Sequence, residues 1–216
     1  GTNGKSSTAR MVDSLLRAFH RRVGLVTSPH LQRVTERIGI DGQPIHPRDY
    51  VRIWHEIKPF VEMVDAQSDV PMSKFEVLVG LSYAAFADAP VDVAVVEVGL
   101  GGRWDATNVV NADVSVITPV GLDHTDYLGD TLAEIAGEKA GIIKPRVPVI
   151  VGPQDDDALR VIEARAMGLS APIVAHGQHW MIQPERDGMV FQDDHGLVAD
   201  GICGPRTWAA LVEKGL

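Results

Sequence analysis

Gly1-Thr2-Asn3-Gly4-Lys5-Ser6-Ser7 opens the chain, and the rest of the sequence is organised around this stretch. A glycine-rich turn leads directly into a lysine, a hydroxyl group and the apolar periodicity of an amphipathic helix. Backbone N–H groups of such a turn can surround phosphate oxygens, and a helix N-terminus adds its positive end. Lys5 would then reach the terminal phosphates and the Ser6 hydroxyl would help to hold Mg²⁺. The alternative is an exposed Gly-Asn turn with a solvated lysine, because the further glycine and the strand that normally precede this fingerprint are not visible.

The composition places this motif in an acidic, core-forming protein. The chain has 216 residues, 45% of them hydrophobic, and a net charge of −9, which suggests one large domain or one domain plus a fragment. The negative charge argues against a nucleic-acid partner or an anionic membrane, so any phosphate site must be a local basic spot. The single cysteine, Cys203, excludes an internal disulfide framework and fits a reducing cytosol. We expect a cytoplasmic protein without a membrane span, because no apolar stretch approaches ~20 residues.

Helical and strand-like stretches alternate outward from the motif. The alternation predicts an α/β fold with a doubly wound, mostly parallel sheet flanked by helices. Ser73 and Glu76 form a capping-box pattern, and Pro59 is expected to kink or split the helix that contains it. The predicted helices span residues 6–22, 47–65, 73–87, 131–141 and 155–167, the strands 23–27, 92–98, 113–119, 147–151 and 173–174, and a hairpin 35–45 with Asp41-Gly42 as its turn.

Three polar residues lie at or just beyond the carboxyl ends of predicted strands, where open parallel sheets bind ligands. Ser28 is a candidate metal or substrate contact, although a plain Ser-Pro turn is the favoured interpretation when the segment is taken by itself. Glu97 is expected to bind a metal, because a carboxylate is costly to bury without a cation, and the alternative is a solvated strand end. His124 is a candidate Mg²⁺ or phosphate contact, although a lone loop histidine is usually neither.

Two cations and a second histidine complete the candidate set. Arg103 follows a run of glycines and could clamp a phosphate or a carboxylate. His30 is a weaker ligand contact in the loop after Ser28. Lys139 lies on a predicted helix, where a lysine normally belongs to a solvated face.

Seven ordered motifs across about two-thirds of the chain resemble the folylpolyglutamate synthase/dihydrofolate synthase family, a branch of the Mur-ligase-like ATP-dependent ligases. The phosphate loop is shared by all Mur-like ligases, whereas SPHL and GLGGRWDATN point to the folate branch. The matching stretches are GTNGKSS at 1–7, TSPHL at 27–31, ERIGIDGQPI at 36–45, SKFE at 73–76, VVEVGLGGRWDATN at 95–108, DHTDYLG at 123–129 and IAGEKAGIIKP at 135–145.

The resemblance implies a central P-loop-type ATPase domain of a ligase of folate and one-carbon metabolism. ATP would phosphorylate a folate carboxylate, and the amine of L-glutamate would then displace phosphate from this acyl phosphate. Dihydropteroate is an additional acceptor in bifunctional members. The resemblance also implies a monomer that binds ATP and two Mg²⁺ ions.

The same resemblance assigns roles to individual residues. Residues 1–7 would bind the phosphates, with Lys5, His124 and Lys139 as catalytic residues. Lys139 matches the lysine that is carbamylated in this family, which would make it a carboxylate-like group near the metal. Metal ligation falls to Ser6, Ser28, Glu97 and His124, and substrate contacts to Ser28, Pro29, His30, Leu31, Arg103 and Asp123.

Some family features are not found in this sequence. The strand before the loop, the C-terminal domain and the adenine- and ribose-binding segment are absent, so we expect an ATP-binding domain at 1–185, incomplete at both ends and inactive alone. Residues 186–216 form an atypical tail, in which 191–216 weakly resembles the second half of a peptidoglycan-binding helical module. A strand at 189–191 followed by a loop and a terminal helix is the simpler interpretation.

Two rival functions stay open at this level. A cell-wall Mur-type amino-acid ligase would use the same ATP chemistry on a different acceptor. A non-catalytic fragment or fusion with a wall-binding tail would need no chemistry from residues 1–7.

Overall fold

The computed structural model describes residues 3–180, and within them seven strands form two sheets. The predicted tail at 186–216 lies outside this range. The first sheet has the order β3-β2-β1-β4, in which β1 and β4 are parallel and the other pairs antiparallel, and the second has the order β5-β6-β7, all parallel. The strands are β1 Val23–Val26, β2 Ile38–Ile40, β3 Gln43–Pro44, β4 Val93–Val96, β5 Ser115–Ile117, β6 Val149–Val151 and β7 Ile173–Ala175.

The predicted α/β class with parallel strands between helices is confirmed, but the strands do not form one continuous sheet. Within residues 3–180, β4 pairs only with β1 and β5 only with β6. The connection between β4 and β5 runs through a glycine-rich loop and a 3₁₀ turn. The two strands that it connects belong to different sheets.

The helices follow the predicted order with small shifts at their ends. Helix α2 runs continuously through Pro59 instead of being split. The helices are α1 Lys5–Ala18, α2 Pro47–Asp65, α3 Lys74–Asp88, α4 Thr125–Leu128, α5 Leu132–Lys139 and α6 Asp156–Gly168, and the 3₁₀ turns are η1 Val34–Arg37, η2 Ala106–Val109 and η3 Ala140–Ile142.

Local sequence signals explain where several elements begin and end. In the capping box of α3, the Glu76 N–H donates to Ser73 Oγ (3.2 Å) and the Ser73 N–H donates to Glu76 Oε2 (2.6 Å). Helix α1 ends before the predicted residue 22, because His20 adopts a left-handed φ of 57° and turns the chain towards β1. The hairpin turn is where the sequence placed it, at Asp41 and Gly42 (φ 51° and 78°).

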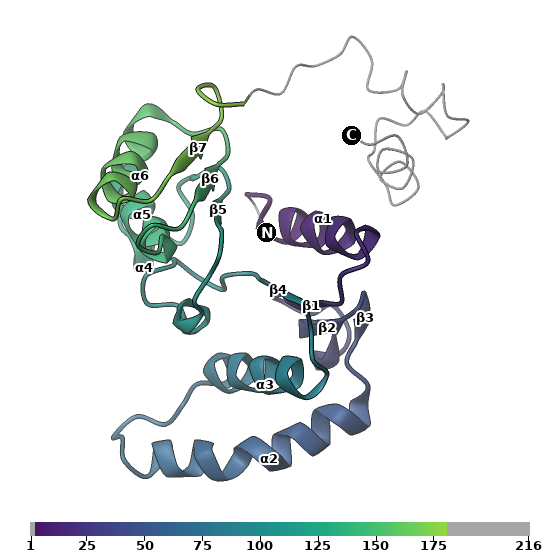
Figure 1. The fold of residues 1–216 in the computed structure, drawn as a ribbon. Helices are drawn as coiled ribbons and strands as arrows, with labels where there is room; N and C mark the ends of the chain where they lie inside the picture. The colour runs from purple at the N-terminus through teal and green to yellow at the C-terminus, as the bar shows by residue number, and fades with distance from the viewer. Residues whose placement is uncertain (1–2, 181–216) are drawn as a thin grey trace.

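Helices cover both faces of the first sheet (Figure 1). Helix α1 lies on one side, and α3 on the other with α2 packed outside it. One buried cluster joins this sheet to α2 and α3, around Ile38, Ile53 and Leu81. A second cluster joins β5–β7 to α5 and α6, around Ile135, Val149 and Ile162. Within the described range, every helix is too short or too polar to cross a bilayer.

Candidate functional site

A buried carboxylate joins the opening motif to the ends of two parallel strands. Glu97 directly follows β4 and is 6% exposed. Its Oε1 accepts a hydrogen bond from Ser6 Oγ (2.6 Å), and its Oε2 accepts one from Thr27 Oγ1 (2.6 Å). The backbone N–H of Ser28 adds a longer bond to Oε2 (3.3 Å). These donors offset the free energy of burying a charge and fix the carboxylate beside the start of α1.

The first turn of α1 contains no acidic residue of its own. Gly4 is its N-cap, with a left-handed φ of 82°, no side chain caps the helix, and no acidic residue lies in its first turn. The first-turn N–H groups are therefore not capped by a side chain of the helix and, together with Lys5, can face a ligand. Ser7 is exposed, and residues 1–2 of the motif lie outside the described range.

Lys139, the last residue of α5, is close enough to Lys5 and Asp123 to sense their charges. Burial lowers the pKa of Lys139 below its ordinary value of 10.5, the Lys5 cation lowers it further, and Asp123 partly opposes both. Lys139 is therefore a partly buried amine rather than a lysine on a fully solvated face. The effects of Lys5 and Asp123 on Lys139 show that the end of α5, the start of α1 and the segment after β5 lie near one another.

The segment after β5 also contacts the opening motif directly. A Cβ at Gly121 would lie 3.5 Å from Asn3 Nδ2. His124 has a left-handed φ of 54°, and its Nε2 lies 3.7 Å from Asp123 Oδ1, with both side chains partly exposed. Within residues 3–180, no hydrogen bond links the His124 side chain to Glu97, so their expected joint role stays a prediction.

The predicted substrate loop is folded back on η1. The carboxylate of Glu36 accepts hydrogen bonds from the backbone N–H groups of Leu31 (2.8 Å), Gln32 (3.1 Å) and Arg33 (2.8 Å). The bonds to Leu31 and Arg33 are the main reason that the pKa of Glu36 is lowered. This carboxylate therefore fixes the backbone immediately after His30.

The side chains of this loop are placed unequally. The Ser28-Pro29 peptide bond is cis. His30 Nδ1 accepts a hydrogen bond from Arg37 Nε (2.9 Å), whereas Leu31 is 89% exposed. His30 is therefore half-buried and held by Arg37, whereas Leu31 is open to a ligand.

A pocket of about 400 Å³ lies between this loop and the loop after β4. Ser28 and Pro29 line one side, and Asp105 accepts hydrogen bonds from Leu100 N–H (2.9 Å) and Thr107 N–H (3.0 Å) on the other. Gly99 lets the Phe75 ring lie against the backbone there, because a Cβ at this position would come within 2.5 Å of the ring. Its lining residues are Ser28, Pro29, Arg37, Phe75, Gly99, Leu100 and Asp105.

Sequence reasoning missed four residues of this region. Thr27, Arg37, Phe75 and Asp105 all lie within matched motifs, so the motifs themselves were the available signal. Arg103, by contrast, is exposed, and its hydrogen bonds to residues 3–180 are made by its backbone, among them the N–H bond to Glu138 O (2.9 Å).

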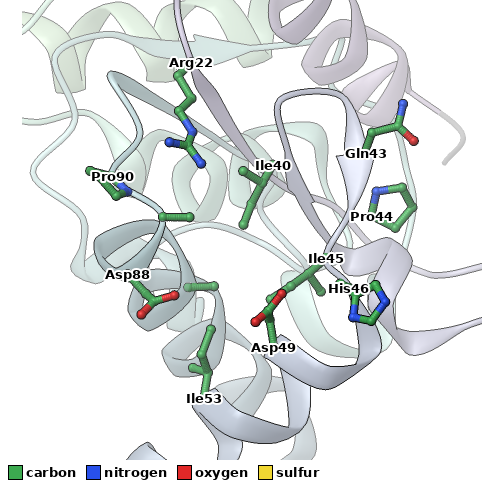
Figure 2. A pocket seen from close by; sticks show the side chains of 12 residues that line it. Arg22, Ile40, Gln43, Pro44, Ile45, His46, Asp49, Ile53, Asp88 and Pro90 are labelled. Atoms are coloured by element: carbon green, nitrogen blue, oxygen red, sulfur yellow. The ribbon is translucent and has the colours of Figure 1, made fainter.

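A second pocket of about 430 Å³ lies at the opposite edge of the first sheet (Figure 2). Arg22 and Pro90, which line it, precede β1 and β4, whereas Glu97 follows β4. Asp49 and Asp88 lie at this pocket, and both pair with Arg52. None of the predicted site residues lines it, so we place the candidate site at the carboxyl edge.

Known proteins share both the sequence and the fold of this chain. No protein-family model matches it. A dihydrofolate synthase/folylpolyglutamate synthase from Mycobacterium tuberculosis (strain ATCC 25618 / H37Rv) is 52% identical over 195 residues, covering 84% of this chain and 40% of that protein. The chain thus spans about 40% of the length of the curated relative.

Solved structures give the same result. The Mycobacterium tuberculosis folylpolyglutamate synthase complexed with ADP and AMPPCP has a TM-score of 0.80 at 53% identity, over 85% of this chain and 43% of that chain. Escherichia coli FolC in complex with DHPP and ADP has a TM-score of 0.78 at 38% identity, over 87% of this chain and 43% of that chain. By sequence and by fold, this chain is a homologue of the dihydrofolate synthase/folylpolyglutamate synthases across the part of them that it covers.

Proposed function

We propose that this chain is the MgATP-binding part of a ligase that joins L-glutamate to folates. The observation that carries the proposal is the Glu97 carboxylate, hydrogen-bonded by Ser6 and Thr27 beside the uncapped N-terminus of α1 and two lysines. The relatives with bound ADP, AMPPCP and DHPP support a nucleotide and a pterin-like acceptor. In the proposed reaction, the γ-phosphoryl group of ATP moves to an acceptor carboxylate, and the amine of glutamate then displaces phosphate.

The phosphates would bind at the start of α1. Backbone N–H groups of residues 3–6 and the helix dipole supply partial positive charge, and Lys5 adds a full one. Lys5 and Lys139 both favour an anion between them, which would relieve their mutual repulsion.

The donor set fits a magnesium site shared with phosphate. The described residues contain no group of three or more His, Cys, Asp or Glu side chains that could hold a metal alone. Mg²⁺ in phosphoryl-transfer sites is typically bound by one or two carboxylates plus substrate phosphates and water. Glu97 with the Ser6 hydroxyl provides such a partial set, and Ser28 and His124 complete the proposal by resemblance. When bound, Mg²⁺ would neutralise charge that develops on the transferred phosphoryl group.

Lys139 is proposed to carry a carbamate. Its lowered pKa increases the fraction of neutral amine, which is the form that attacks CO₂. The new N–C bond gives a carbamate and releases one proton. The product is an anion beside Lys5, so modification would replace a repulsive pair with an attractive one.

The pocket between the loops after β1 and β4 is proposed to hold the pterin-like end of the acceptor. Phe75 offers an aromatic face, Asp105 a carboxylate acceptor and Arg37 a cation, which suit a flat heteroaromatic group with N–H donors. Pro29 and the exposed Leu31 would add apolar contact from the loop. L-glutamate as the second substrate, a monomer and a cytoplasmic location are further parts of this proposal.

Nucleotide binding tests the proposal directly. We expect Lys5→Ala to weaken binding of Mg·AMPPCP about ten-fold or more in isothermal titration, because it removes a charge-assisted phosphate contact. Lys58→Ala, on the outer face of α2 where Lys58 pairs with Glu62 (3.3 Å), is the matched control and should bind normally. Equal affinity of Lys5→Ala and wild type would contradict the assignment. Binding of dihydropteroate, against nucleotide-linked muramyl acids, separates the folate ligase from the cell-wall ligase.

A further inference from the structure

Two side chains outside the proposed binding residues fasten the Arg103 loop to the end of α5. Asn108, on η2, donates through Nδ2 to the carbonyl oxygens of Arg103 (3.0 Å) and Gly141 (3.2 Å). Lys144 donates through Nζ to the backbone oxygen of Asn108 (2.7 Å) and to its Oδ1 (2.9 Å). We call this pair the Asn108–Lys144 clasp.

The segments that the clasp joins meet backbone to backbone. The Arg103 N–H donates to Glu138 O (2.9 Å). A Cβ at Gly102 would lie 2.7 Å from Glu138 O and 2.9 Å from Lys139 O, and a Cβ at Gly141 would overlap Arg103. Because the glycines leave no side chain between them, a small opening of this contact displaces the backbone of Lys139 itself.

The clasp has a specific chemistry. Each polar atom of the Asn108 side chain has a partner: Nδ2 faces two carbonyl oxygens and Oδ1 faces an ammonium group. A carboxylate in place of the Asn108 amide would place an acceptor against the carbonyl oxygens of Arg103 and Gly141. An apolar side chain in place of Lys144 would remove the donor from two partly buried oxygens of Asn108, its backbone oxygen and its Oδ1.

The position of the clasp links it to the site. The Arg103 loop begins just after Glu97, and Lys139 ends the helix on which that loop rests. Within residues 3–180 no strand pairing connects the sheet of β4 to the sheet of β5, so loop contacts of this kind contribute to the distance between Glu97 and Lys139.

We infer that Asn108 and Lys144 are positioning residues that keep Lys139 at the distance from Glu97 that nucleotide binding requires. The inference deepens the proposed function and depends on it only for the nucleotide. Neither residue is assigned a contact with the phosphates; both act through the backbone of residues 102–103 and 138–141.

Lys144→Met tests the clasp with two measurements. We expect amide hydrogen exchange at Arg103 to become about ten-fold faster and Mg·AMPPCP affinity to fall about ten-fold, the size expected for losing hydrogen bonds to a charged group. Lys144→Arg keeps the cation and should restore both. Lys58→Met makes the same chemical change on the exposed face of α2 and should alter neither.

Two further variants keep the test decisive. Asn108→Asp should accelerate exchange at Arg103 even if Lys144→Met folds poorly. Ile162→Val, on the buried face of α6, loosens packing away from the clasp and should leave nucleotide affinity unchanged at temperatures well below unfolding. Unchanged Arg103 exchange in both clasp variants, or an equal loss of affinity in Ile162→Val, would overturn the inference. Faster Arg103 exchange in a protein that binds no nucleotide even as wild type would support the clasp and reject the proposed function.

Discussion

Glu97 and Lys139 are two charged residues that the protein buries in different ways. Glu97 is surrounded by donors from Ser6, Thr27 and Ser28, so its charge is compensated within the described structure. Lys139 instead has a second cation nearby, because Lys5 affects the pKa of Lys139 more strongly than Asp123 does. A hydrogen-bonded acid beside two cations that repel each other is the arrangement expected of a site that receives an anion.

Compared with the protein in which Lys139 is an unmodified amine, Lys139→Met should raise the free energy of unfolding at neutral pH. The pKa of Lys139 is lower in the folded than in the unfolded chain, so folding is penalised wherever the unfolded lysine is charged. The penalty is full below the folded pKa and fades as the pH rises towards the ordinary value of 10.5. Urea denaturation should therefore show a gain for Lys139→Met at neutral pH that shrinks in alkaline buffer. A gain that is independent of pH would show that the charge is not the cause.

At the scale of elements, glycines set how closely helices and strands approach. Gly24, in β1, lies under the ring of Phe86 from α3, and a Cβ there would come within 2.7 Å of ring carbons. Phe86 is itself buried, so the ring has little room to move. The close approach of α3 to β1 therefore depends on the missing side chain.

Gly24→Ala should destabilise the protein by about 1–3 kcal/mol, the usual range for overpacking a core. Gly80→Ala is the matched control: Gly80 lies within α3, and a Cβ added there would meet no atom within 4 Å, so alanine should stabilise by roughly 0.5–1 kcal/mol through helix propensity. Chemical denaturation of both variants measures the difference. Equal effects in the two variants would mean that the Phe86 contact does not limit the packing.

The loop at residues 31–33 should open in acid. Its backbone N–H groups lower the pKa of Glu36, so the stabilisation is complete above the ordinary value of 4.5 and is lost as the pH falls through the folded pKa. Amide chemical shifts of Leu31 and Arg33 should follow this titration. Glu36→Gln should show loosened amides at every pH, whereas Glu134→Gln, in the capping box of α5, should leave the loop signals unchanged.

At the scale of the whole molecule, each sheet has an outer strand, β4 or β5, that pairs on one side only within residues 3–180. On the β1 side of β4, the Val93 N–H donates to Arg22 O (3.3 Å) and the Glu97 N–H donates to Val26 O (3.0 Å). Because N–H groups alternate in direction along a strand, those of Ala94 and Val96 point to the opposite side of β4. Ser115 donates towards β6 (3.0 Å), so the Val116 N–H points away from it. Val116 is also 42% exposed, which is unusual for a parallel strand.

Hydrogen exchange should therefore distinguish the two edges of each strand. We expect the amides of Ala94, Val96 and Val116 to exchange at least about ten-fold faster than those of Val95 and Ile117, which face partner strands. Residue-resolved exchange by NMR makes this comparison within one sample. Similar protection on both edges would contradict the two-sheet arrangement.

Local patterns in the sequence were enough to predict most elements. The capping boxes at Ser73 and Thr131 and the Asp41-Gly42 turn fix chain direction through bonds that span at most a few residues. The family motifs likewise pointed to Lys5, Glu97 and Lys139. The position of His124 relative to Glu97 remains a prediction.

The sequence by itself determined the α/β class, the helix starts and the stretch that is the candidate phosphate loop, because each depends on residues that are neighbours along the chain. Only the tertiary structure decided that Thr27 binds Glu97 across 70 positions, that Asn108 and Lys144 join across 36, and that the strands divide into two sheets. Contacts of this kind depend on how whole elements pack, and no local periodicity or capping pattern encodes which distant groups packing will bring within bonding distance.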